Sequence, residues 1–372
     1  MKTGLNAIFL EGKRTGVGRY LESLLREWAY AGLSDEFVLY FLNERPCDSF
    51  LADGPFDIRR LSMVEYGQMD VFQYELTHSP VDVFFSALYD LPLSVNCPAV
   101  ITVHDMIHEA FPESFSDIQL NYLREKHAFS IGRAARIVTD SDFSKNEIIS
   151  RFPEAEGRIT VIPLAASPVF KERDRLQGFV RKRFGVSEPF IFYVGAVTPK
   201  RHIRPVIEAF LMLAGEFPDW SLITIGRNVT YPYEDLHELA SQANVALKRK
   251  AVIYEEFISD GELLELYNAA DIFIYLSTYE GFGMPPLEAM ACGTPVITTT
   301  VSSLPEVAGD AALLVNPADS RDVCNALERL MESSELREEY RKRGLRRAAQ
   351  FSWAATALRT MEVLREAACL KS

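Results

Sequence analysis

Two glutamates bracket a glycine-rich segment in the last third of the 372-residue chain. Glu280 and Glu288 stand eight positions apart, with Gly281 and Gly283 between them. Carboxylates recognise sugar and ribose hydroxyls because they accept charge-assisted hydrogen bonds. Glycines let the backbone approach a ligand closely, and free N–H groups at a helix start favour phosphate oxygens. The segment therefore has the residue types of a site for a phosphorylated sugar. The structural alternative is one helix-terminal and one surface glutamate.

A pair of cations occupies the loop of residues 195–202. Lys200 and Arg201 both have side chains that pair with a pyrophosphate, Arg as a bidentate donor and Lys as a point charge. The alternative is two solvated cations at a helix start, but the helix dipole would repel them there. The sequence therefore favours a phosphate-binding role for this pair.

The apolar pattern places both segments after predicted strands. Residues 272–275 precede the glutamate segment, and residues 190–194 precede the basic loop. A short helix is expected to begin between the two glutamates, with Pro286 at its first position and Gly293 just past its end. In open α/β sheets, ligands bind at the carboxyl ends of the strands.

Along the whole chain, short apolar runs alternate with helical patterns, which predicts parallel sheets covered by helices. The pattern resets near residue 168, and a charged stretch at residues 171–185 is expected to be helical. A last amphipathic helix begins at Trp353. Strands are predicted at residues 5–10, 37–42, 83–85, 100–103, 137–139 and 160–162, and then at 190–194, 222–225, 252–254, 272–275, 296–299 and 312–315.

In the first half of the chain, the candidate ligand-binding features are a glycine turn and a histidine. Gly16 and Gly18 fill two positions of a dinucleotide-binding fingerprint, but Leu21 stands at the third and no acidic residue follows at the expected strand end. The turn is therefore weak evidence for NAD. His104 follows the strand at residues 100–103, where a lone histidine is most often structural.

Further along, the chain resembles a known family. Residues 279–295 are similar to the E-x7-E signature of retaining glycosyltransferase family 4, whose members have the GT-B fold. Residues 257–271 and 304–315 resemble the stretches on either side of that signature. The resemblance covers nearly all of the second half and patches of the first. It is closest to bacterial mannosyltransferase-like enzymes that extend cell-surface polysaccharides, often with GDP-mannose.

This resemblance implies a role for each matching residue. Glu280 would contact the donor sugar and Glu288 the nucleotide ribose, and His104 would contact a sugar or the acceptor. Lys200 and Arg201 stand in the reverse of the family's usual order. The implied catalytic residues are Glu280, His104, Lys200 and Arg201. The implied donor-binding residues are Gly16, Gly18, Lys200, Arg201, Phe257, Glu280, Gly281, Phe282, Gly283, Met284, Pro285, Leu287 and Glu288.

The resemblance also implies the architecture: an α/β GT-B fold of two facing Rossmann-like domains with parallel sheets. Residues 1–168 would form the acceptor side and residues 169–352 the donor side, with residues 353–372 packing on the first domain. The expected reaction moves a hexose from a nucleotide diphosphate sugar to a growing surface glycan or a lipid-linked acceptor. The leaving diphosphate would be stabilised without a metal.

Neither a metal nor any cofactor is expected. The sequence Asp140-Ser141-Asp142 imitates a DxD metal motif, but it stands where a helix cap is expected. Five cysteines form an odd set without a CxxC pair, which argues against a disulfide framework or a zinc site.

Charge and hydropathy limit the partners. A net charge of −13 argues against nucleic acid, because the field of the protein repels phosphates. No signal sequence or membrane-spanning stretch is recognised, so a cytoplasmic protein is expected. A lipid-linked acceptor would bring it into peripheral contact with the inner membrane. Two alternatives stay open: a nucleotide-sugar epimerase of the same architecture, and a non-catalytic nucleotide-sugar-binding protein.

Overall fold

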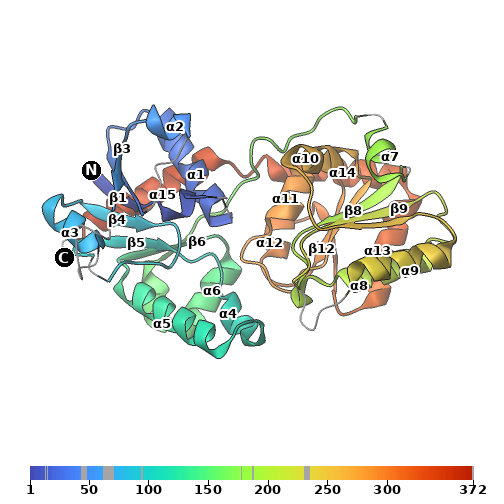
Figure 1. Ribbon diagram of the computed structural model, residues 1–372, viewed down its shortest axis with the longest axis horizontal. Helices are drawn as coiled ribbons and strands as arrows, with labels where there is room; N and C mark the ends of the chain where they lie inside the picture. The colour runs from blue at the N-terminus through green and yellow to red at the C-terminus, as the bar shows by residue number, and fades with distance from the viewer. Residues whose placement is uncertain are drawn as a thin grey trace. The chain divides into compact units, whose positions relative to one another are not determined.

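The computed structural model describes residues 1–370 except 13, 15, 43–47, 62–70, 94, 177, 187 and 230–234. Contacts divide the chain into two compact units. Unit 1 comprises Met1–Leu164 with Ser352–Ser372, and unit 2 comprises Ala165–Phe351. Each unit is built around its own sheet (Figure 1).

Unit 1 contains a seven-stranded sheet in the order β3-β2-β1-β4-β5-β6-β7. Every pairing that the structure describes in it is parallel. Its strands are β1 (Lys2–Asn6), β2 (Glu36–Phe41), β3 (Phe56–Arg60), β4 (Val83–Ser86), β5 (Ala99–Thr102), β6 (Arg136–Thr139) and β7 (Ile159–Val161).

Two predictions for this sheet were wrong. The first strand ends at Asn6, and the apolar residues after it form a 3-10 helix, η1 (Ile8–Leu10), which the run of hydrophobic side chains concealed. The strand β3 was not predicted. Its sequence, Phe-Asp-Ile-Arg-Arg, is charged and mostly half-buried, because it lies at the edge of the sheet.

The helices of unit 1 include the last helix of the chain. They are α1 (Gly16–Tyr30), α2 (Ser49–Ala52), α3 (Val71–His78), α4 (Ile107–Ala110), α5 (Asp117–Arg133), α6 (Asp142–Arg151) and α15 (Trp353–Ala368), with the 3-10 turns η2 (Pro112–Ser114) and η3 (Pro153–Arg158). Helix α15 is fastened by long-range bonds: Trp28 Nε1 donates to Ala357 O at 3.0 Å, and Thr356 Oγ1 donates to Pro163 O at 2.7 Å.

Unit 2 contains a six-stranded sheet in the order β10-β9-β8-β11-β12-β13, again with parallel pairing throughout the described residues. All six strands were predicted, with bounds within one residue, because their apolar runs are almost completely buried. They are β8 (Phe190–Val194), β9 (Ser221–Ile225), β10 (Val252–Glu255), β11 (Ile272–Tyr275), β12 (Val296–Thr299) and β13 (Ala312–Val315).

Helices cover both faces of this second sheet. In Figure 1, α8 and α9 lie on one side of it, and α10, α11 and α14 lie on the other. The helices of unit 2 are α7 (Phe179–Phe184), α8 (Ile203–Leu213), α9 (Leu236–Leu247), α10 (Asp260–Ala269), α11 (Met284–Ala291), α12 (Leu304–Ala308), α13 (Ser320–Glu332) and α14 (Ser334–Ala348), with the 3-10 turn η4 (Pro199–Arg201).

The prediction of a helix over residues 171–185 was wrong in its length, because only the short helix α7 forms there. The charged residues before α7 have helical propensity, but the backbone of this stretch is bonded elsewhere. The Arg173 N–H donates to Oδ1 of Asn268 at 2.8 Å, which fastens the stretch to α10.

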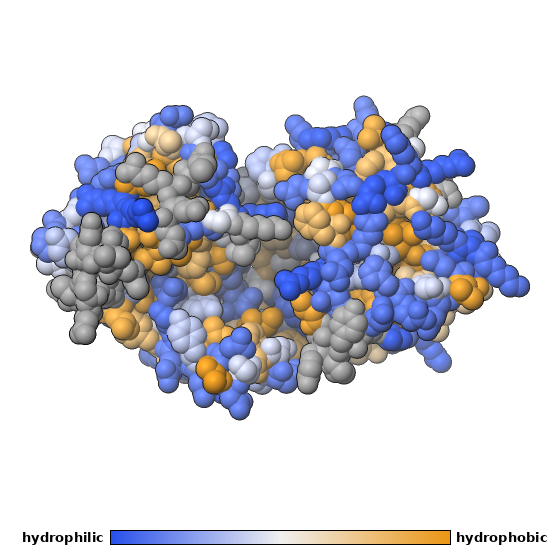
Figure 2. Space-filling model, viewed as in Figure 1, coloured by the Kyte–Doolittle hydropathy of each residue, from blue (hydrophilic) through white to orange (hydrophobic). Residues whose placement is uncertain are grey.

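The surface is mostly hydrophilic on the face shown in Figure 2, with apolar side chains scattered between the charged ones. Among the helices that the structure describes, none combines the length and apolar character needed to cross a bilayer.

Candidate functional site

The carboxylate of Glu280 is held by three donors on one oxygen. Its Oε1 accepts hydrogen bonds from Tyr275 Oη at 2.9 Å, Ser277 Oγ at 2.8 Å and Arg201 Nε at 2.9 Å. The second oxygen, Oε2, has one longer contact, to Arg201 Nη2 at 3.4 Å. Only 13% of the side chain is exposed. Glu280 is therefore fixed, with Oε2 as the oxygen open to a further donor.

Two cations surround this carboxylate from the loop after β8. Lys200 is buried, donates from Nζ to Tyr279 O at 2.8 Å and lies 3.8 Å from Glu280 Oε1. Burial acts to raise the pKa of Glu280. The charges of Arg201 and Lys200 outweigh that effect and hold the pKa below its usual 4.5. The structure thus places the predicted Lys200, Arg201 and Glu280 in one cluster.

Helix α11, which follows the loop that carries Glu280, has a glycine and two prolines at its start. Gly283 takes a φ of 109°, which favours glycine, and a Cβ there would lie 2.6 Å from Cδ2 of the buried Leu304, whose side chain would have to shift. Helix α11 begins at Met284, two residues before the position predicted from Pro286. Because the prolines at 285 and 286 have no N–H, the backbone N–H groups without a partner inside this helix are those of Gly283 and Met284.

Other side chains of residues 279–295 pack within the fold. Phe282 is buried and packs edge-on against Phe351, with centroids 5.8 Å apart. The Leu287 side chain is completely buried, and its backbone N–H lies at the first bonding position inside α11, so its predicted donor contact stays a prediction. Gly293 follows the helix with a φ of 78°, which confirms the predicted helix end.

Glu288 lies in the middle of α11 and is half-buried. Its Oε2 accepts a hydrogen bond from Tyr267 Oη, on α10, at 3.0 Å. It therefore does not stand in the first turn of its helix, where a carboxylate would serve only to complement the helix dipole.

The chain matches known proteins along most of its length. Residues 14–168 match the domain described as Glycosyltransferase Family 4, and residues 177–347 match the one described as Glycosyl transferases group 1. Over 360 residues the chain is 30% identical to the O-antigen chain mannosyltransferase B of Escherichia coli, with 91% of this chain and 93% of that protein covered. The chain belongs to glycosyltransferase family 4.

Further relatives support this family 4 assignment. The O-antigen chain mannosyltransferase RfbU of Salmonella typhimurium is 30% identical over 242 residues, which cover 65% of this chain and 63% of that protein. The Anabaena HepE structure with UDP and glucose superposes with a TM-score of 0.74 at 18% identity, covering 98% and 100% of the two chains. WaaG, a glycosyltransferase of lipopolysaccharide biosynthesis, gives 0.71 at 16% identity, covering 98% and 99%. The family 4 chain has the predicted GT-B fold.

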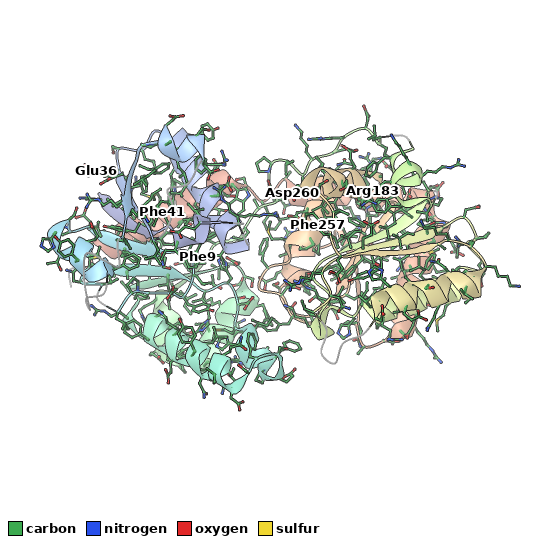
Figure 3. The ribbon with its side chains drawn as sticks, viewed as in Figure 1. Phe9, Glu36, Phe41, Arg183, Phe257 and Asp260 are labelled. Carbon is green, nitrogen blue, oxygen red and sulfur yellow. The ribbon has the colours of Figure 1, made fainter. Side chains whose placement is uncertain are left out.

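In unit 1 of this family 4 protein, the glycine turn has a packing reason. A Cβ on Gly18 would lie 2.4 Å from the carbonyl oxygen of Phe9, a residue labelled in Figure 3, whereas a Cβ on Gly16 would meet nothing within 4 Å. Gly18 lets α1 approach η1 closely. That explains one of the two glycines without a ligand, and their predicted donor contact stays a prediction.

His104 has both ring nitrogens on protein acceptors. Nδ1 lies 2.7 Å from Asp140 Oδ2, and Nε2 lies 3.1 Å from Ala87 O. A neutral imidazole has one N–H, so only the cation donates to both. Burial acts to lower the pKa of His104, but the charge of Asp140 outweighs it and raises the pKa above 6.5. The contact of His104 with a sugar or acceptor also stays a prediction.

Sequence reasoning missed the role of Asp140. It identified the stretch only as an imitation of a metal motif and predicted a helix cap. The cap is confirmed: the Ser141 side chain accepts from Ser144 N at 3.1 Å at the start of α6. The first aspartate instead pairs with a histidine 36 positions earlier, a partnership that no local spacing signals. Within the described residues, no group of three or more His, Cys, Asp or Glu side chains could hold a metal ion.

Phe257 lies at the loop between β10 and α10, close to Asp260 in Figure 3. The residue is 70% exposed, which is unusual for a phenylalanine, and aromatic rings with accessible surface can stack on a planar ligand. Its predicted contact with the donor stays a prediction.

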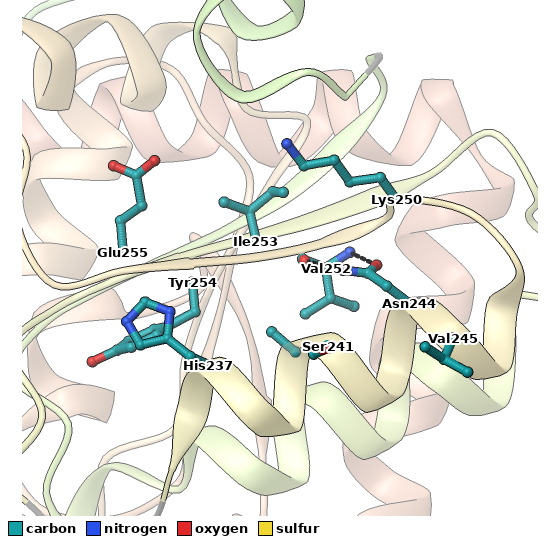
Figure 4. Close-up of a pocket in the computed structure, with 10 residues that line it drawn as sticks. His237, Ser241, Asn244, Val245, Lys250, Val252, Ile253, Tyr254 and Glu255 are labelled. Carbon is teal, nitrogen blue, oxygen red and sulfur yellow. Dashed lines mark hydrogen bonds between the residues drawn. The ribbon is translucent and has the colours of Figure 1, made fainter.

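A separate pocket of about 580 Å³ lies between α9 and the edge strand β10 (Figure 4). His237, Tyr254 and Lys250 line it, and none of the predicted site residues does. Within it, the Asn244 side chain bonds to the strand: Nδ2 donates to Val252 O at 2.8 Å, and Oδ1 accepts from Val252 N at 2.8 Å and from Ala251 N at 2.7 Å. This pocket is therefore distinct from the glutamate site.

Proposed function

We propose that this glycosyltransferase moves a hexose, with retention and without a metal, from a nucleotide diphosphate sugar to a growing surface glycan or a lipid-linked acceptor. GDP-mannose is the favoured donor. The relatives named as O-antigen mannosyltransferases support this choice of sugar and acceptor class.

The observation that carries the proposal is the cluster of Glu280 with Lys200 and Arg201. Arg201 donates from Nε and Nη2 to Glu280 and from Nη1 to Ala196 O, and the guanidinium has further N–H donors beyond these. Those donors and the adjacent Lys200 charge suit a leaving diphosphate. Fixed positive charge at that point stabilises the transition state electrostatically, which is the role proposed for both cations.

The two glutamates divide the recognition of the donor. Glu280 presents Oε2 toward a sugar hydroxyl, because Oε1 is already occupied by three donors. Glu288 lies eight residues further along, on the face of α11 next to α10, and would accept from the ribose hydroxyls. The exposed ring of Phe257 would border the base. A proton leaving the acceptor would pass to a phosphate oxygen on the same face of the sugar.

The experiment that tests the proposal begins with thermal unfolding of the wild type and of Glu288→Ala in the presence of GDP, UDP, ADP and dTDP. A diphosphate at about 100 times its Kd should stabilise by roughly 2.7 kcal/mol. The exposed glutamate variant Glu362→Ala, on α15 in unit 1, is the matched control and should keep the shift. A shift that Glu288→Ala retains in full would contradict the ribose assignment.

Turnover then separates the proposal from its alternatives. GDP-mannose with a mannosyl acceptor and EDTA should give a product with the α-configuration of the donor, read by NMR. Free epimerised sugar formed without an acceptor would indicate an epimerase. Binding without any turnover on a panel of mannosyl and lipid-linked acceptors would indicate a non-catalytic binder.

A further inference from the structure

Two buried tyrosines hold the two glutamates of the site. Tyr275 Oη bonds to Glu280 at 2.9 Å, and Tyr267 Oη bonds to Glu288 at 3.0 Å. The tyrosines stand eight positions apart, as the glutamates do. Both tyrosines are fully buried, so their hydroxyls reach the glutamates from inside the core.

The ring of Tyr267 is fixed by aromatic packing on several sides. Its centroid lies 5.4 Å from those of Phe170, Phe192 and Phe273, which come from the segment before α7, from β8 and from β11. The Thr294 hydroxyl also donates to the backbone carbonyl of Tyr267. Because a buried ring in such a setting has little rotational freedom, its hydroxyl occupies a fixed point beside α11.

The hydroxyl of Tyr267 acts as the donor in its bond to Glu288. Burial, together with the negative charge of Glu288, raises the pKa of Tyr267 well above 10, so the phenol keeps its proton. A carboxylate that accepts this bond on Oε2 loses rotational freedom about its last torsion. Its other oxygen then points in a defined direction.

We propose that Tyr267 is a positioning residue for ribose recognition: its hydroxyl fixes Oε2 of Glu288 so that the carboxylate meets the ribose hydroxyls of the bound nucleotide in one orientation. The inference rests on the proposed function, since it assigns Tyr267 to the same nucleotide site. The Glu280 carboxylate is held by Tyr275, Ser277 and Arg201.

The test compares the Kd of a nucleoside diphosphate with that of its 2′,3′-dideoxy analogue by calorimetry. The diphosphate is GDP, or whichever of UDP and ADP binds instead, because dTDP already lacks the 2′ hydroxyl. The wild type should prefer the ribonucleotide by about tenfold or more, the effect of one hydrogen bond to a charged group. Tyr267→Phe, which keeps the packed ring, should reduce this preference below about threefold and leave the Kd of the dideoxy analogue unchanged.

The matched control is Tyr340→Phe, which removes the hydroxyl of a buried tyrosine on α14 outside the site and should keep the full preference. Equal weakening of both ligands by Tyr267→Phe, or an undiminished preference, would overturn the inference and leave the proposed function standing. Absence of binding of all four diphosphates to the wild type would overturn both.

A crystal structure of the wild type with the same diphosphate provides a measurement that does not depend on how well the variant folds. Glu288 should contact the ribose while its bond to Tyr267 stays near 3.0 Å. A Glu288 that has turned away from Tyr267 to reach the ribose would overturn the inference.

Discussion

Arg201 donates from Nε to Glu280 Oε1 across 2.9 Å, and this bond joins two loops whose residues are 79 positions apart in the chain. One loop follows β8 and the other follows β11, which are neighbouring strands of the second sheet. Because parallel neighbours end at the same edge, their loops meet there. The bond therefore sets the distance between the cations and the carboxylate of the proposed donor site.

Replacing Arg201 should weaken both binding and folding. In Arg201→Met the buried Glu280 charge loses its principal partner, so we expect a loss of about 1–3 kcal/mol in the free energy of unfolding. The affinity for the diphosphate should fall by about tenfold or more, because a charged donor is removed. Urea unfolding and calorimetry measure the two effects. Arg343→Met, which breaks a surface pair with Glu339 on α14, should change neither by much. Unchanged affinity in Arg201→Met would contradict the phosphate role.

The His104–Asp140 pair predicts a dependence of stability on pH. The folded-state pKa of His104 is raised above 6.5, so its contribution is fully present below pH 6.5 and is lost as the pH rises through the folded-state pKa. We expect the difference in unfolding free energy between the wild type and His104→Gln to shrink as the pH rises from 6 to 9, measured by urea unfolding. Comparing the two proteins at each pH cancels the other titrating groups. A difference that grows with pH would show that the histidine is neutral.

The two glycines of the first turn should respond differently to the same substitution. Gly18→Ala places a methyl group 2.4 Å from the Phe9 carbonyl, so the backbone must shift, and a loss of about 1–3 kcal/mol is expected. Gly16→Ala meets open space and should be neutral or stabilising by up to about 1 kcal/mol. Thermal unfolding of both variants decides. Equal losses would show that the turn tolerates neither change and that packing against Phe9 is not the reason.

Replacing Asn244, which lies outside the glutamate site, should lower the free energy of unfolding without changing ligand binding. Asn244→Ala removes three hydrogen bonds to the backbone of Ala251 and Val252, for which we expect a loss of about 2–3 kcal/mol. Asn244→Asp keeps the acceptor but loses the donor, so an intermediate loss is expected. Gln242→Ala removes an exposed bond to Glu238 on the same helix and should change stability by less than about 0.5 kcal/mol. Diphosphate affinity should be the same in all three variants.

The fold could be predicted where burial is complete. Every residue of Ile272–Tyr275 and Val296–Thr299 is buried, and the bounds of both strands were predicted without error. Edge positions carry a weaker signal, which is why Phe56–Arg60 was missed. The helix predicted at residues 171–185 failed because a side chain from α10 binds its backbone, an interaction that propensity does not contain.

The residues of the candidate site could be proposed from the sequence, but the side chains that hold them in position could not. The glutamates and the cations share a local context that resembles a family signature, so the sequence identified them. Tyr267 and Asp140 act on partners 21 and 36 positions away, respectively, and only the folded chain brings them together. Long-range side-chain pairs of this kind have no periodic pattern to reveal them.

Asn244 occupies the position that a neighbouring strand would take. Strand β10 is the last strand on its side of the sheet, and the outward-facing N–H and C=O of Val252 are both bonded to one carboxamide. An exposed sheet edge is a template on which another chain can add a strand and begin to aggregate. The Asn244 carboxamide makes the donor and acceptor bonds to Val252 that a peptide group of a neighbouring strand would make. At this point, therefore, the sheet is closed to growth by intermolecular pairing.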